Sequence, residues 1–148
     1  MIALRTARPE DAPRLLAIWR GAVLATHDFL DRDDFAEIEA MVAQQYLPSA
    51  PLWLAVDEHD VPVAFMGLTD SHIDALFVDP DRRGTGVGRL LIDHARALHP
   101  AGLTVDVNEQ NPGAVGFYQR LGFRRTGRSP LDDAGRSYPL LHLALDPA

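Results

Sequence analysis

The 148-residue sequence contains no cysteine and no lysine, and it has no apolar run near the roughly 18 residues of a membrane-spanning helix. Without cysteine, the chain can form no disulfide, no metal–thiolate site and no thioester intermediate of its own. All 14 cationic side chains are arginine, so the chain cannot acylate a lysine of its own.

Negative charge predominates, with a net charge of −7 and a pI near 5.2. Nonspecific nucleic-acid binding requires a basic face, so we expect no nucleic-acid partner and a cationic or neutral substrate. The N-terminal segment has no basic stretch followed by an apolar one, and we therefore expect a cytoplasmic protein without membrane contact. The length, with 47% apolar residues, predicts a single domain over residues 1–148.

Helical and strand periodicities alternate along the chain, which predicts one α/β unit. A first helix begins at Pro9-Glu10-Asp11. Further helices are expected over residues 33–46, 87–98 and 114–121, and strands over 2–8, 52–57, 61–68, 73–78, 103–107, 123–128 and 138–145. The spacing within the third helix predicts that it buries Val87, Leu90, Leu91, Ala95 and Leu98.

A glycine-rich turn joins the strand at 73–78 to the helix at 87–98 and reads Arg83-Gly84-Thr85-Gly86-Val87-Gly88. Glycines let the backbone approach a ligand closely, and the first amides of a helix have no intrahelical partner. A dinucleotide-binding fingerprint is excluded because G-x-G-x-x-G is absent in the required register, and a P-loop is excluded because the chain has no lysine. The turn therefore predicts a nest of amides that binds a small molecule carrying a pyrophosphate.

A second motif follows the strand at 103–107, and its residues run from Asn111 through Phe117-Tyr118 to Phe123. Together the two motifs resemble the GNAT superfamily of N-acetyltransferases. The family's R/Q-x-x-G-x-G/A signature corresponds to Arg83 through Gly88, and its N-x-x-A-x-x-F-Y-x-x-x-G-F signature corresponds to Asn111 through Phe123. The segments ATHDFL, VNEQN and YPLLHL look like those of a small bacterial branch of the superfamily. The resemblance implies an α/β (α+β) fold, with a mixed, mostly antiparallel sheet of six or seven strands flanked by about four helices.

The resemblance also implies acetyl-CoA as cosubstrate, an amine as acceptor and no metal. It places the CoA pyrophosphate on the amides of the glycine turn, and the pantetheine arm as an added strand beside Phe77 and Val78. It implies that Asn111 hydrogen-bonds this arm and that the Tyr118 hydroxyl lies near the thioester sulfur. The expected CoA-binding residues are therefore Phe77, Val78, Arg83, Gly84, Thr85, Gly86, Val87, Gly88, Arg89, Asn111 and Tyr118.

Acetyl transfer to an amine needs a base for the amine, a donor for the oxyanion and an acid for the leaving thiolate. On family grounds, Tyr118 is the candidate general acid and a backbone N–H near Val78 is the candidate oxyanion donor. The reaction expected is direct attack within a ternary complex.

The general base has three candidates. Alternation along the strand predicts that His72, Asp74, Leu76 and Val78 share one face, near the strand end where the family carries its base. Of these, His72 is favoured over Asp74 because an imidazole titrates near neutral pH. His27 is the third candidate, since its connector corresponds to a wall of the acceptor site in the family.

The acceptor stays open among a small amine, an amino acid, a peptide N-terminus and a protein lysine. Two other functions also stay open, namely a non-catalytic acyl-CoA-binding sensor on the same fold and an interaction module with an empty glycine turn. The chain is expected to act as a monomer or a homodimer.

Overall fold

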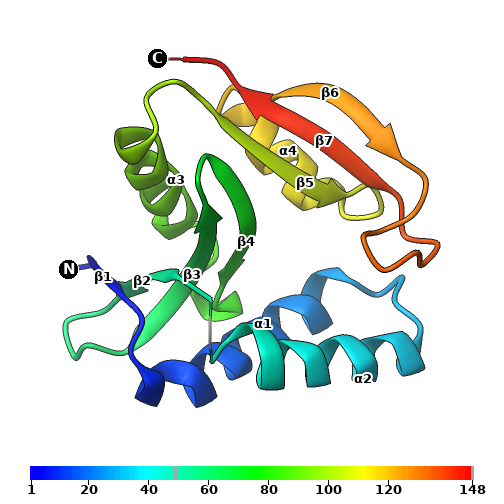
Figure 1. Cartoon of the computed structure of the whole chain (residues 1–148). Helices are drawn as coiled ribbons and strands as arrows, with labels where there is room; N and C mark the ends of the chain where they lie inside the picture. The colour runs from blue at the N-terminus through cyan, green and yellow to red at the C-terminus, as the bar shows by residue number, and fades with distance from the viewer. Residues whose placement is uncertain (49, 148) are drawn as a thin grey trace.

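A computed structural model describes residues 1–48 and 50–147, which form a single seven-stranded sheet with helices on both faces (Figure 1). The strand order is β1-β2-β3-β4-β5-β7-β6, and all pairs are antiparallel except β4 with β5. The strands are β1 (Ala3–Thr6), β2 (Leu52–Val56), β3 (Pro62–Thr69), β4 (His72–Val78), β5 (Leu103–Asn108), β6 (Arg124–Ser129) and β7 (Leu140–Leu145). The helices are α1 (Ala12–Thr26), α2 (Arg32–Met41), α3 (Val87–Leu98) and α4 (Pro112–Arg120).

The predicted fold class is confirmed, and most element boundaries lie within two residues of the expected ones. The helix expected over 33–46 is α2 followed by a π-helical turn, η2 (Val42–Tyr46). Short 3-10 turns, η1 (Pro9–Asp11) and η3 (Pro80–Arg82), precede α1 and the glycine turn. Of the helices in the described ranges, none has the length and apolar content needed to cross a membrane.

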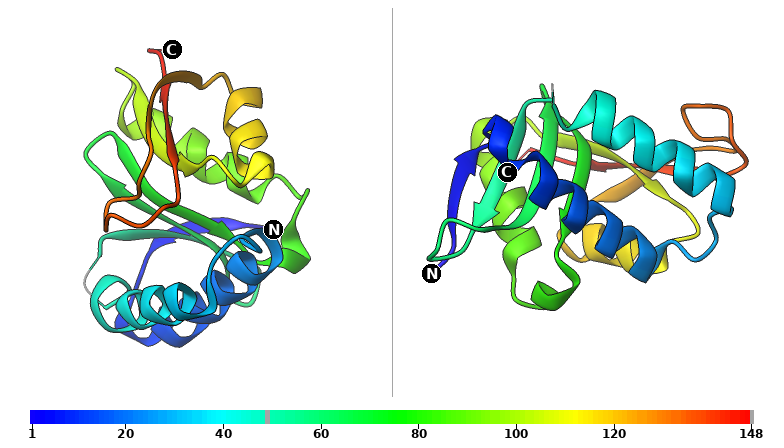
Figure 2. Two further views of the ribbon diagram at one scale, coloured as in Figure 1. Left: turned by 90° about the vertical axis from the view of Figure 1, so that its right-hand side faces the viewer. Right: turned by 90° about the horizontal axis from the view of Figure 1, so that it is seen from below.

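The helices divide the core into two layers. One core cluster joins α3 and α4 to one face of the sheet, and a second joins α1 and α2 to the other face over β2, β3 and β4. Figure 2 shows α1 and α2 together on one side of the molecule, away from α3 and α4. The α1–α2 layer ends near β4, so β5, β7 and β6 keep a partly exposed face on that side.

The predicted buried face of α3 is correct for Val87, Leu91 and Ala95 but wrong for Leu90 and Leu98, which are 37% and 45% exposed. The helix instead buries Gly88 and Ile92. A three-or-four-residue spacing fixes the period of an amphipathic helix but leaves the edges of its apolar stripe uncertain by one residue.

Strands β4 and β5 separate soon after they begin. Their parallel pairing consists of His72 with Thr104 and Ile73 with Val105, and neither strand pairs with the other beyond that point. The two strands therefore form a fork, and the β5-facing edge of β4 from residue 74 onward keeps unpaired backbone groups. Such an edge can accept an added strand.

The expectation that His72, Asp74, Leu76 and Val78 share one face is wrong. Gly67 pairs with Ala75 and the next residue of β3, Leu68, pairs with Ile73, so Asp74 has no partner on β3 and the alternation shifts there. The Asp74 carboxylate accepts a hydrogen bond from Thr69 on the α1–α2 face, whereas Leu76 and Val78 pack into the α3–α4 core. A β-bulge changes which face the following residues occupy, and the sequence carries no mark of it.

Candidate active site

A pocket of about 470 Å³ opens along the free end of β4. Its walls come from the C-terminal end of α1, the end of β4, the glycine turn with the start of α3, and α4. Of the residues predicted from sequence, it contains His27, Phe77, Val78, Arg83, Gly84, Gly86, Val87, Gly88, Arg89, Asn111 and Tyr118. It does not include His72 or Asp74 in its lining.

A second hollow of about 610 Å³ lies at the opposite end of β5, around Gly102 and Leu145, and it is more open to solvent. None of the predicted site residues lines it. The smaller pocket is therefore the better candidate site, because the glycine turn, the free strand edge and the titratable side chains meet there.

The glycine turn has the backbone that its sequence suggested. Gly84 and Gly86 have φ angles of +73° and +84°, and among the described residues none beyond the two chain neighbours comes within 4 Å of a Cβ placed on either glycine. Glycine is therefore needed there for conformation and not for space. Gly86 is the N-cap of α3 and offers no side-chain cap, so the amides of the first helical turn remain available to an anion.

Gly88 is constrained differently. A Cβ on this residue would lie 3.2 Å from the Phe117 ring, so glycine lets α3 approach α4 closely at the pocket. Nearby arginines add positive charge: Arg82, Arg83 and Arg89 line the pocket with Arg120 of α4. Arg120 was not identified from the sequence, because its place beside the turn depends on how α4 docks.

Asn111 has a structural role that the sequence analysis did not include. Its Oδ1 accepts the Ala114 amide at 3.2 Å, and the residue is the N-cap of α4. An asparagine N-cap satisfies one of the unpaired amides of a helix start. The side-chain NH₂ of Asn111 can still donate to a ligand in the pocket.

Tyr118 is 5% exposed and packs edge-on against both Phe117 and Phe123. Burial raises the pKa of its hydroxyl well above the usual value of 10.0, because the tyrosinate would lose its hydration. The hydroxyl therefore stays protonated at physiological pH and can serve as a proton donor.

His27 follows α1 and is held in a defined tautomer. The Thr26 hydroxyl donates to the Ala22 carbonyl at 2.7 Å, so its single proton is already used. The His27 Nδ1, 2.7 Å from the same hydroxyl, must then carry a proton and donate it, which leaves Nε2 with a lone pair in the neutral ring. Burial lowers the pKa of His27, with a smaller opposing effect of Asp28, and favours this neutral form.

His72 lies at the fork, on the sheet face that α1 and α2 leave partly open. Its Nδ1 is 2.8 Å from the Thr104 hydroxyl, and its Nε2 is 3.8 Å from the Asp106 carboxylate. Asp106 in turn accepts from His142 at 2.6 Å, and His142 is 2.7 Å from the Ser129 hydroxyl. This chain of polar side chains crosses four strands.

The sequence analysis missed Asp106, His142 and Ser129. A weak signal existed, because Asp106 lies between Val105 and Val107 and His142 lies between Leu141 and Leu143, so each titratable side chain occupies the outward position of an alternating strand. However, β5 and β7 are neighbours only in the folded sheet, and that pairing brings Asp106 opposite His142.

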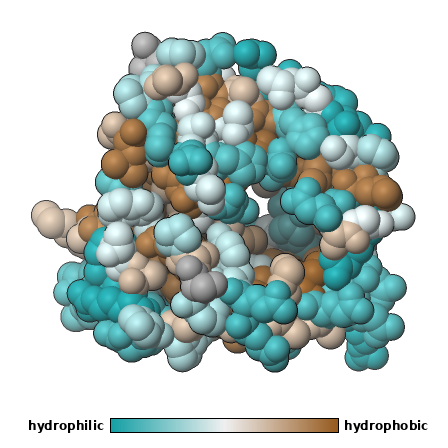
Figure 3. Space-filling view, viewed as in Figure 1, coloured by the Kyte–Doolittle hydropathy of each residue, from teal (hydrophilic) through white to brown (hydrophobic). Residues whose placement is uncertain are grey.

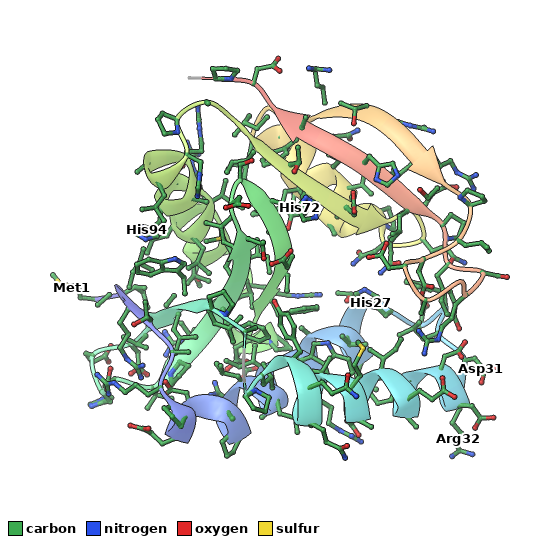
Figure 4. The ribbon with its side chains drawn as sticks, in the orientation of Figure 1. Met1, His27, Asp31, Arg32, His72 and His94 are labelled. Carbon is green, nitrogen blue, oxygen red and sulfur yellow. The ribbon has the colours of Figure 1, made fainter. Side chains whose placement is uncertain are left out.

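Figure 3 shows a hollow near the centre of the molecule. In Figure 4, His27 and His72 lie on opposite sides of this central opening. The α1–α2 connector and the β6–β7 loop meet at its rim, where the Phe29 and Tyr138 rings are 5.9 Å apart and the Tyr138 hydroxyl donates to Asp34. The hollow therefore has walls on both the sheet side and the helix side.

Comparisons with known proteins agree with this geometry. Residues 25–138 match the sequence model of an acetyltransferase (GNAT) domain. The chain is 56% identical over 143 residues to "Peptidyl-lysine N-acetyltransferase YjaB" of Salmonella typhimurium, and 54% identical over 144 residues to the protein of that name in Escherichia coli, with 97% of each chain covered in both cases. The solution structure of apo-form YjaB from Escherichia coli superimposes with a TM-score of 0.94 at 53% identity, covering 100% of this chain and 99% of that one.

Proposed function

The chain belongs to the GNAT acetyltransferase family, and on this premise we propose that it moves the acetyl group of acetyl-CoA onto lysine side chains of peptides or proteins, with residues 1–148 acting as one domain. The observation that carries the proposal is the pocket itself. It joins an uncapped helix start, suited to a diphosphate, to a free strand edge and a buried tyrosine hydroxyl. The names of the two relatives support lysine as the acceptor.

The diphosphate of acetyl-CoA binds the amides from Arg83 to Arg89, including those of Thr85, Val87 and Gly88. The partial positive charge at the N-terminus of α3 favours an anion there, and the pocket arginines add full charges. The pantetheine arm then lies along β4, where Phe77 and Val78 offer backbone groups that β5 does not use.

Two side chains bind the arm from either side. The Asn111 NH₂ group donates to an arm carbonyl, and the His27 Nε2 lone pair accepts an arm N–H. Because His27 lines the same pocket as Tyr118, we assign it to cosubstrate binding and leave the base to a residue at the fork.

His72 is the base in this proposal. The thioester enters the fork from the α3–α4 side, and the acceptor reaches it from the central hollow, where His72 lies. The ammonium of the acceptor gives one proton to a His72 ring nitrogen, and the resulting amine attacks the thioester carbon. Backbone N–H groups near Val78 stabilise the oxyanion. The C–S bond then breaks, the nitrogen loses its second proton to solvent, and Tyr118 protonates the thiolate.

The test is an assay of purified protein with acetyl-CoA and a lysine peptide whose N-terminus is blocked. We expect release of free CoA and gain of one acetyl group on the lysine, and neither with a matched norleucine peptide. A panel of small amines and free-N-terminus peptides checks the other acceptor classes. Binding of acetyl-CoA without turnover on any amine would contradict the proposal and identify the chain as an acyl-CoA sensor.

A further inference from the structure

The cluster around Asp106 lies beside the fork but has no role in the steps above apart from His72. Val105 and Val107 are buried against α3 and α4, at 3% and 7% exposure, so Asp106 between them projects from the opposite face. That face borders the central hollow, and Asp106 follows directly after the last residue of β5 that pairs with β4.

Hydrogen bonds on both sides hold His142 in one orientation. A carboxylate only accepts, so the His142 Nδ1 carries a proton and donates it to Asp106 Oδ1 at 2.6 Å. In the neutral ring, Nε2 is then an acceptor for the Ser129 hydroxyl at 2.7 Å. His142 therefore fixes the Asp106 carboxylate without neutralising it.

The other carboxylate oxygen keeps accepting capacity. Asp106 Oδ2 is 3.8 Å from His72 Nε2, which is longer than a direct hydrogen bond. Among the described residues, the ion-pair partners of Asp106 are the two imidazoles, and no guanidinium lies within ion-pair distance. While both imidazoles are neutral, the cluster carries one negative charge that faces the hollow.

Three carboxylates on neighbouring elements already have partners. Asp31 caps α2 by accepting the Asp33 amide, and Asp34 accepts from Tyr138 and pairs with Arg136. Asp74 accepts from the Thr69 hydroxyl.

We propose that Asp106 is the binding site for the ammonium group of the acceptor, with His142 as the residue that positions it. The inference rests on the proposed lysine acetylation. The ammonium donates to Asp106 Oδ2, which brings its nitrogen beside His72, and the aliphatic stem of the lysine occupies the hollow. The site explains how an acceptor that must arrive charged is oriented before it loses its proton.

The first test measures peptide affinity for the CoA-bound protein by calorimetry. Lysine and norleucine peptides differ in the ammonium alone, so their affinity ratio reports its recognition. A charge-assisted hydrogen bond is expected to make the ratio about tenfold or more in the wild type. In Asp106→Asn, which keeps the shape and still accepts from His142, the ratio should fall to about one, and in His142→Gln it should fall in part.

Two controls accompany this test. Asp146→Asn removes a carboxylate that pairs with Arg124 on the exposed surface, and it should keep the wild-type ratio. Affinity for CoA alone should be unchanged in all variants. An Asp106→Asn protein that acetylates lysine peptides and discriminates them as the wild type does would overturn the subsite and leave the proposed function standing. Absence of any lysine acetylation by the wild type would remove both.

A second measurement needs no variant and covers the case in which Asp106→Asn fails to fold. Imidazole NMR signals of His72 and His142 are followed while lysine peptide is added to the CoA-bound wild type. We expect both to shift with the lysine peptide and not with the norleucine peptide. Unchanged signals at a saturating lysine peptide concentration would overturn the proposal.

Discussion

The hydroxyl of Tyr46 lies 1.9 Å from the position that a Cβ atom on Gly67 would occupy. Gly67 pairs with Ala75 at the register shift of β4, so this contact brings η2 against the sheet close to the fork. Among the described residues, none hydrogen-bonds this buried hydroxyl, and burial, assisted by the charge of Asp74, raises the pKa of Tyr46 to about 12.

Gly67→Ala is therefore expected to destabilise the protein by about 1–3 kcal/mol, because the added methyl group overlaps the tyrosine. In a Tyr46→Phe background the cost should fall by more than about 0.5 kcal/mol, since the clashing oxygen is gone. Urea unfolding of the two single variants and the double variant measures this coupling. Strictly additive effects would show that Tyr46 moves aside in solution.

Gly86→Ala tests the anion site. Its φ of +84° makes a side chain costly by about 1–2 kcal/mol, and the strained turn should weaken acetyl-CoA binding. Gly135 is a matched control, because its φ is +80° and its Cβ position is equally open, but it lies in the β6–β7 loop. Calorimetry should show similar destabilisation in both alanine variants and loss of acetyl-CoA affinity in Gly86→Ala alone. Equal affinities of the two alanine variants for acetyl-CoA would argue against diphosphate binding at the turn.

Tyr118→Phe removes the proposed acid and keeps the packed ring. We expect kcat to fall about 10²-fold or more, since the thiolate must leave unprotonated, with little change in acetyl-CoA affinity. Steady-state kinetics and calorimetry separate the two effects. Retention of full turnover would exclude the acid role.

His72 and His27 are distinguished by which kinetic parameter changes. His72→Gln should lower kcat about 10²-fold and flatten the acidic limb of its pH profile, because the base is lost. His27→Gln should mainly raise KM for acetyl-CoA, since its Nε2 is assigned to the arm. His59→Gln, at an exposed turn, should change neither parameter. The reverse pattern would transfer the base role to His27.

The lowered pKa of His27 leads us to expect that the stability of the protein depends on pH. Its folded-state pKa is lowered by burial, so the unfolded chain binds more protons at mildly acidic pH, and the stability contributed by the neutral form is lost as pH falls. The loss begins near the ordinary value of 6.5 and continues through the lower folded value. Urea midpoints between about pH 8 and pH 5.5 should fall in the wild type and in His59→Gln, and fall less in His27→Gln. An identical fall in all three proteins would contradict a lowered pKa of His27 in the folded protein.

Local patterns made much of the fold predictable. The glycine turn, the strand before it and the helix after it could be read from Ile73 to Leu98, because each feature depends on residues close in sequence. The Asn111 motif was equally local, and in the structure the same asparagine caps α4. Leu90 and Leu98 were misplaced because burial at the edge of a helix stripe depends on what packs beside it.

The candidate site was only partly predictable, because some of its residues are brought together by packing and strand pairing and not by their position in the sequence. The residues of the cosubstrate pocket come from two short motifs, and all but Thr85 of the predicted CoA-binding residues line it. Asp74 was grouped with Leu76 because strict alternation was assumed, and a bulge set by the β3–β4 pairing breaks it. Arg120 lines the pocket because of how α4 docks, and the sequence does not predict that docking.

The sequence alone determined that this chain has an α/β domain with a glycine turn at a helix start and a GNAT-type pair of motifs, because these features are written in neighbouring residues. The tertiary structure decided where β4 and β5 part, that Asp106 meets His72 and His142, and that Thr26 sets the tautomer of His27. These contacts depend on strand order, on strand register and on the direction of hydrogen bonds. All three are set by the folded arrangement of the chain, so local sequence patterns do not predict them.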